Sequence, residues 1–217
     1  MKNIAFAFIL AASCLALQAQ NAESDYLYTT KSFKDESPKK IIAGTSHGNI
    51  SVSDVPASQT RVEVYVHASN SNQELSKQEI QKKLDEYYTL EISLSGDVLN
   101  ASAHRKKDIL SNESGLSISF GIYAPKTASA ILKTSHGNVD LTGLVGNQDA
   151  ETSHGDITIS KITGKVVGRT SHGNVSVTDC KNDIDVRTDH GDITGRNCEG
   201  TIKLITSHGN IDLRDLN

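Results

Sequence analysis

The sequence has no tryptophan, one methionine, four phenylalanines and six tyrosines among its 217 residues. So few large apolar side chains argue against a thick globular core and favour thin, repetitive β-structure. Basic residues are not in excess either, since lysine and arginine total 22, aspartate and glutamate total 26, and the formal net charge is −4. A mildly acidic chain offers little to nucleic acid phosphates, so no nucleic acid partner is expected.

Long apolar runs are also missing, except at the start of the chain. Lys2 precedes an apolar run from Ile4 to Leu17, and the small residue Ala19 stands before polar Gln20. This pattern predicts a signal peptide over residues 1–20 and a mature chain over residues 21–217. No later stretch is apolar for the roughly 20 residues that a membrane helix needs, so no transmembrane span is expected in the mature chain.

The leader predicts export to the periplasm, to the cell surface or into the medium. Lipid attachment at Cys14 is an alternative, because the small residues Ala11, Ala12 and Ser13 precede it. The apolar run continues past Cys14 as far as Leu17, which favours ordinary cleavage of the leader over lipidation.

A four-residue motif, Thr-Ser-His-Gly, recurs through the C-terminal half. Copies begin at a constant 18-residue interval, at Thr134, Thr152, Thr170, Thr188 and Thr206, with Asp in place of Ser in the fourth of them. A sixth copy, residues 45–48, stands apart upstream. After each motif an Asn or Asp is followed by apolar residues at every second position, which is the alternation of a β-strand.

Each 18-residue unit, called a rung, contains two short strands and two turns, and the rungs occupy residues 126–217. A unit this small cannot bury its apolar face alone, so the rungs must stack on one another. The sequence therefore predicts a mainly β fold, a parallel β-solenoid of 18-residue rungs. One apolar column of this solenoid is expected to contain Leu144, Ile162, Cys180, Cys198 and Leu216.

The motif glycine is expected to make the turn. Glycine adopts positive φ without steric cost, and the Asn or Asp that follows is expected to hydrogen-bond its own backbone. These structural glycines are Gly48, Gly137, Gly155, Gly173, Gly191 and Gly209.

Residues 53–125 do not repeat. Arg61 to Ala68 alternates as a strand, Ser76 to Glu79 resembles a capping box that starts a helix, and Leu90 to Leu94 and Leu116 to Tyr123 indicate two more strands. This N-terminal strand-helix-strand insertion is expected to pack beside the first rungs or to cap their open end, within a single domain.

These features together resemble a known family. The Gly48-Asn-Ile strand, the strand-helix-strand insertion, the Ile122-Tyr-Ala-Pro-Lys126 segment and the repeated motif are similar to the bacterial putative adhesin family of β-strand repeat domains. The resemblance covers essentially the whole mature chain. It implies a secreted or envelope-associated protein with a right-handed β-solenoid-like fold, without a defined ligand and without catalytic residues. The constant His is a departure, because that position is varied in the family.

Six of the eight histidines share the third motif position. They are His47, His136, His154, His172, His190 and His208. Stacked rungs would place at least the last five in one column, where adjacent imidazoles are candidate ligands for Zn²⁺ or Ni²⁺, with Asp156 or Asp192 adding an oxygen. A turn residue copied with the repeat is the favoured interpretation, because ligands from a single face leave a metal site open, so no cofactor is expected. The column would also gain like charges below about pH 6.5.

Neither Ser-His chemistry nor any other catalysis is expected. Neighbouring side chains on a strand point to opposite faces and cannot pair as nucleophile and base. The same pair also recurs in nearly every rung, whereas catalysis needs one asymmetric constellation, and no nucleophile elbow or phosphate-binding loop is found.

The two cysteines outside the leader are separated by one full repeat. Cys180 and Cys198 are thus expected in one column of consecutive rungs, where export would allow a disulfide. Two free buried thiols are an equally weighted alternative, because stacked parallel side chains do not readily reach the torsion angle of a disulfide.

The sequence therefore predicts an exported, non-enzymatic module that binds a surface or envelope ligand or has a structural role. A glycan, another polymer or a protein would meet a regular face decorated with Asn, Asp, Thr and Ser. Metal binding by the His column is the alternative function, and self-association through the last rung is a further hypothesis.

Overall fold

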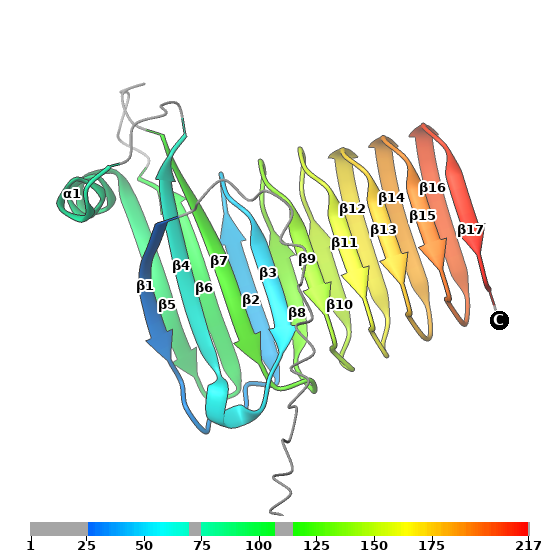
Figure 1. Cartoon of the computed structure of the whole chain (residues 1–217), viewed down its shortest axis with the longest axis horizontal. Coiled ribbons are helices and arrows are strands. Elements are labelled where there is room, and N and C mark those ends of the chain that lie inside the picture. The colour runs from blue at the N-terminus through cyan, green and yellow to red at the C-terminus, as the bar shows by residue number, and fades with distance from the viewer. Residues whose placement is uncertain (1–25, 70–74, 107–114, 217) are drawn as a thin grey trace, which may run out of the picture.

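The computed structural model describes residues 26–69, 75–106 and 115–216. These residues form a mainly β structure of two sheets that lie in two layers (Figure 1). The predicted leader and Cys14 lie outside the described residues. Sheet A has nine strands in the order β1-β4-β7-β3-β9-β11-β13-β15-β17, and sheet B has eight in the order β16-β14-β12-β10-β8-β2-β6-β5. Both sheets contain parallel and antiparallel pairs, and neither closes on itself. The prediction of a mainly β fold is confirmed.

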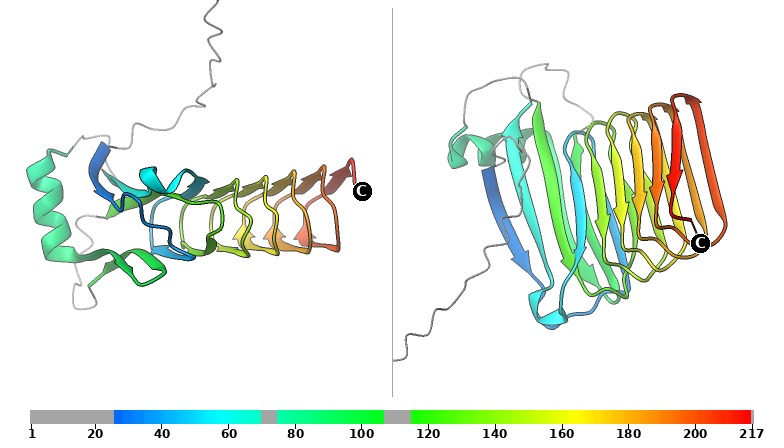
Figure 2. Two further views of the ribbon diagram at one scale, coloured as in Figure 1. Left: turned by 90° about the horizontal axis from the view of Figure 1, so that it is seen from below. Right: turned by 45° about the vertical axis from the view of Figure 1, so that its right-hand side comes forward.

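The repeats contribute one strand to each sheet in turn. The strands of sheet A in this part are β9 (Val139–Thr142), β11 (Ile157–Ser160), β13 (Val175–Thr178), β15 (Ile193–Arg196) and β17 (Ile211–Arg214). Those of sheet B are β8 (Ser129–Lys133), β10 (Gln148–Glu151), β12 (Val166–His172), β14 (Ile184–His190) and β16 (Ile202–His208). Neighbours are parallel and offset by one repeat, as in Ile157 beside Val175. Paired residues of neighbouring strands are therefore 18 positions apart in both sheets. Figure 2 shows the strands of successive repeats lying one beside the next.

The upstream motif copy belongs to the same stack. Its flanking strands are β2 (Lys40–Thr45) and β3 (Ile50–Asp54), which pair in parallel with β8 and β9. Ile50 lies beside Val139 although the whole non-repeating segment separates them along the chain. The copy that stands apart in the sequence is therefore the neighbour of the copy at Thr134 in space.

The non-repeating segment extends both sheets beyond β2 and β3. Sheet A continues with β7 (Leu116–Ala124), β4 (Arg61–Ala68) and β1 (Tyr26–Ser32), and sheet B continues with β6 (Val98–Arg105) and β5 (Tyr88–Ser95). A short 3₁₀ turn, η1 (Ala57–Gln59), precedes β4. The outermost pairs are antiparallel, and helix α1 (Lys77–Tyr87) lies at the end of the molecule away from the last repeat (Figure 2).

The predicted helix begins as expected, whereas strands β1, β2 and β6 were not predicted. Ser76 and Glu79 form a capping box, and Ile80 and Leu84 are the buried residues of α1. Strand β6 escaped prediction because two of its three buried positions, Ala101 and Ala103, have short side chains that give a weak alternation. Within the described ranges no helix is long and apolar enough to cross a bilayer.

The core is a narrow layer between the sheets. Its largest fully buried side chain is Phe120 on β7, and the repeats contribute mainly Val, Ile and Leu. Burial fails at the last repeat, where Ile211 is 45% exposed and Leu216 is 44% exposed. The prediction that Leu216 is buried is wrong, because no strand of the described chain stacks beyond β16 and β17.

Candidate functional site

The motif turns connect the strands of sheet B to those of sheet A. All six motif glycines have the expected positive φ, between 134° and 156°. Each turn also rests directly on the preceding one, since a Cβ on Gly173 would lie 2.0 Å from the carbonyl oxygen of Gly155. The glycine is required both for the backbone angle and for this close approach.

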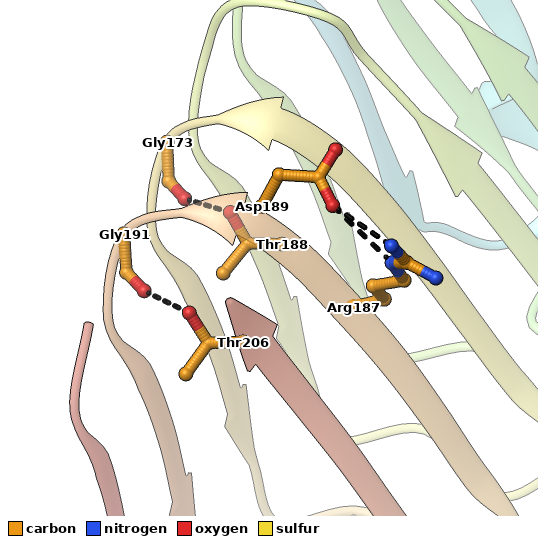
Figure 3. Close-up of polar contacts among 6 residues, drawn as sticks. All are labelled: Gly173, Arg187, Thr188, Asp189, Gly191 and Thr206. Carbon is orange, nitrogen blue, oxygen red and sulfur yellow. Dashed lines mark hydrogen bonds and ion pairs between the residues drawn. The ribbon is translucent and has the colours of Figure 1, made fainter. Parts of the chain in front are cut away.

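The motif threonines tie consecutive turns together from the inside. Figure 3 shows the hydroxyl of Thr188 donating to the carbonyl oxygen of Gly173, and that of Thr206 to Gly191, both at 2.9 Å. The same bond recurs at 3.0 Å in the three preceding repeats. Thr188 is fully buried, so its hydroxyl needs this partner.

The Asn or Asp after the glycine makes a second ladder on the outside. The side-chain oxygen of Asn174 accepts a hydrogen bond from the backbone N–H of Asp192 at 2.9 Å, and Asp192 accepts from Asn210 at 2.7 Å. This corrects the expectation that the side chain bonds its own backbone. It bonds the next repeat because the equivalent amide of that repeat lies directly beside it.

The motif histidines form one exposed column of six stacked rings. Neighbouring ring centroids are 4.6 to 4.9 Å apart and the ring planes differ by 2° to 4°. His47 stacks on His136, so the upstream copy extends the predicted column from five to six. Burial, the neighbouring His136 and Arg105 all lower the pKa of His47.

The stacked rings do not converge on a metal position. Two nitrogens bound to one Zn²⁺ are at most about 4.2 Å apart. Equivalent nitrogens of parallel stacked rings are separated by the ring spacing of 4.6 to 4.9 Å, and their lone pairs run side by side. The described residues also contain no group of three or more His, Cys, Asp or Glu side chains placed to hold a metal ion. Chelation by His136, His154, His172, His190 or His208 would need ring rotation.

Cys180 and Cys198 lie in consecutive repeats and are free thiols. Both are buried, and each sulfur contacts the carbonyl oxygen two residues before it, Thr178 at 3.3 Å and Arg196 at 3.2 Å. Burial raises the pKa of Cys180 to about 11, and the adjacent Cys198 adds to the rise. Of the two alternatives, the structure has the buried thiols rather than the disulfide.

The outer face of sheet B is charged and largely self-paired. Lys133 bonds Glu151 at 2.7 Å, and Arg187 bonds Asp189 at 3.0 Å (Figure 3). Further pairs join Arg169 to Asp149 and Lys203 to Asp185, each at 3.7 Å. These groups are already neutralised by neighbours, which leaves little unpaired charge to recognise a ligand.

The outer face of sheet A has a different composition over β3, β9, β11 and β13. Its outward residues are small and almost all hydroxylated, and they form a surface named here the hydroxyl floor: Ser51, Ser53, Asp140, Thr142, Thr158, Ser160, Ser176 and Thr178. Thr142 and Ser160 hydrogen-bond each other across the strands. Consecutive columns follow the strand spacing of about 4.8 Å, so the floor is about 14 Å from β3 to β13.

Large side chains border the hydroxyl floor on β7 and β4. The guanidinium carbon of Arg61 lies 3.7 Å from the ring centroid of Tyr123. The Glu63 carboxylate accepts from Arg61 at 2.8 Å and from the hydroxyl of Tyr65 at 2.6 Å. Desolvation opposes the effect, but these hydrogen bonds lower the pKa of Glu63. Sequence analysis missed this cluster, although the alternation of Arg61 to Ala68 places Arg, Glu and Tyr on one face.

Comparison with known proteins finds likeness in structure only. No family model matches the chain, and no curated protein matches it. A putative adhesin from Bacteroides fragilis has a TM-score of 0.47 at 16% identity, over 86% of this chain and 95% of that one. A putative cell adhesion protein from Clostridium sporogenes has a TM-score of 0.45 at 9% identity, over 87% and 98%. A putative adhesin from Parabacteroides distasonis has a TM-score of 0.40 at 15% identity, over 87% and 79%. The adhesin descriptions of these structures agree with the resemblance predicted from the sequence.

Proposed function

We propose that the protein is an exported, non-enzymatic binding module that holds an extended polymer of the cell envelope or cell surface on its hydroxyl floor. The repeats would stack as rungs of a parallel β-solenoid, and this stack would present one flat face to the polymer. The supporting observation is the difference between the two outer faces. Sheet B pairs its own charges, whereas sheet A presents rows of small hydroxyl groups at the strand spacing.

Hydroxyl rows suit a polymer with repeated polar groups. Each Ser or Thr can donate and accept, and a flat array of short side chains lets a chain lie close to the backbone. Little side-chain entropy is lost on binding, because Ser and Thr have few rotamers. Parallel strands make the array regular, so several weak contacts can add along one ligand.

Adding bulk to each face in turn tests the floor. Ser176→Arg places a long charged side chain in the β13 row of the hydroxyl floor, and Val167→Arg places the same side chain on the outer face of sheet B. Co-sedimentation with insoluble cell-wall and polysaccharide fractions is expected to fall for Ser176→Arg and to stay unchanged for Val167→Arg. Equal binding by both variants would refute the assignment of the face.

Export is tested independently of binding. The protein recovered from outside the cytoplasm is expected to have the intact mass of a chain that begins after Ala19 or Gln20. A retained leader in the mature product, or a lipid on Cys14, would contradict that prediction.

The metal alternative has a direct test, and no described geometry favours it. Calorimetric titration with Zn²⁺ or Ni²⁺ would establish it through saturable binding that His154→Ala and His172→Ala abolish. Self-association through the last repeat stays a prediction. It rests on the exposure of Ile211 and Leu213, and sedimentation at rising protein concentration tests it.

A further inference from the structure

Tyr123 stands at the border between the hydroxyl floor and the large side chains of β4. The register of sheet A places Arg61 beside it on β4 and Ser53 beside it on β3. Tyr123 is therefore the first aromatic side chain that a ligand lying on the floor would meet at this side.

One face of the Tyr123 ring is occupied from the β4 side. Arg61 lies over it at 3.7 Å, and Arg61 is itself held by Glu63 and by the backbone oxygen of Gln59 at 3.2 Å. The guanidinium covers one face of the ring, and the register places Ser53 of the floor beside Tyr123 on the side away from β4.

Neighbouring residues hold the ring in place. Gly121, one position earlier on the same face of β7, leaves space between two tyrosines, since a Cβ there would lie 3.5 Å from both the Tyr123 and Tyr65 rings. Tyr65 is fixed in turn through its bond to Glu63. The side chains of Tyr123 and Tyr65 are thus ordered before any ligand arrives, which reduces the entropy cost of binding.

We propose that Tyr123 and the adjoining hydroxyl floor form a binding subsite for a neutral glycan, a proposal that rests on the function given above. A pyranose ring has an apolar C–H face, which packs on an aromatic ring, and hydroxyl edges, which pair with Ser53, Thr142 and their neighbours. A neutral sugar suits the site better than an acidic one. The Arg61 guanidinium is already paired with Glu63, so it does not attract an acidic sugar. The carboxylate of Asp140 lies on the floor and would repel one.

Binding to an array of neutral and acidic glycans, followed by calorimetry with the best neutral oligosaccharide, tests the subsite. Tyr123→Ala is expected to weaken binding about tenfold through loss of the stacking face. Tyr123→Phe keeps the face and is expected to bind like the parent protein. Tyr28→Ala, beside Gln81 of α1, removes a tyrosine remote from the floor and serves as the control.

The outcomes separate the two proposals. Neutral glycan binding that survives Tyr123→Ala, with Ser176→Arg still impaired, would overturn the Tyr123 subsite and leave the floor as the binding face. Binding to acidic glycans alone would overturn the choice of ligand. An array on which the parent protein binds nothing, together with no retention by envelope fractions, would refute the proposed function itself. Unchanged melting curves for all variants show that the fold is intact.

Discussion

Replacing Gly173 by alanine tests how closely the motif turns are stacked. The new Cβ would lie 2.0 Å from the Gly155 oxygen and 2.5 Å from its carbonyl carbon, and the φ angle of Gly173 is 156°. Both neighbouring atoms belong to backbone, so a side-chain rotation cannot relieve the contact. The turn must move away from the turn before it.

The cost of that movement follows from what joins the two turns. The N–H of Gly155 donates to His172 at 2.9 Å, and the hydroxyl of Thr170 donates to Gly155 at 3.0 Å. Losing two such bonds costs about 2 kcal/mol. The positive φ adds about 1–2 kcal/mol for any residue with a Cβ. We expect Gly173→Ala to lower the free energy of unfolding by about 3–4 kcal/mol, or the melting temperature by about 6–16 °C.

Gly96 provides a matched control. It has φ of 54° in the turn between β5 and β6, and a Cβ there would have no atom within 4 Å. Gly96→Ala should therefore show only the backbone cost, about 1 kcal/mol. Denaturant unfolding followed by circular dichroism measures both variants. Equal destabilisation of the two would refute the argument from turn stacking.

Three further predictions concern the ladders and the thiols. The pKa of His47 is lowered in the folded state by burial, His136 and Arg105, so the unfolded chain takes up its proton first. The stability linked to His47 is present above about pH 6.5 and declines as the pH falls from there through the lowered folded pKa. Denaturation at several pH values measures this decline. His47→Gln should flatten the dependence of the free energy of unfolding on pH. Cys180 and Cys198 should resist thiol reagents at pH 8 until the protein unfolds, because both thiols are buried and burial raises the pKa of Cys180 to about 11. Rapid labelling of the native protein, or a mass that shows a disulfide, would contradict the structure. Asn174→Ala should cost about 1 kcal/mol by removing the acceptor for the Asp192 amide, which denaturant unfolding measures.

The 18-residue interval determined much of this structure from the sequence alone. Strand pairs such as Ile157 and Val175 follow directly from it, because identical short units bury their apolar residues by lying one above another. The positive φ of the motif glycines and the capping box of α1 are equally local, and each depends on a few adjacent residues. Local chemistry of this kind can be deduced without tertiary structure.

Other features depended on which segments meet in space. No local signal places Ile50 beside Val139, because the segment between them makes separate strands and a helix before the chain returns. The direction of the Asn174 bond likewise depends on the presence of Asp192 in the next repeat. A side chain with two available partners takes the one that stacking brings closer.

The candidate site was likewise predicted in part from the sequence and decided in part by the tertiary structure. Alternation along each strand was enough to predict an outward face of Thr, Ser, Asn and Asp. Only the tertiary structure distinguished the paired charges of sheet B from the hydroxyl floor of sheet A, and only it brought Tyr123 of β7 between Arg61 of β4 and Ser53 of β3. Periodicity tells which residues of a repeat share a column, since that is a property of one unit and its copies. Which columns lie beside one another, and what borders them, is decided by how non-repeating strands join the sheet.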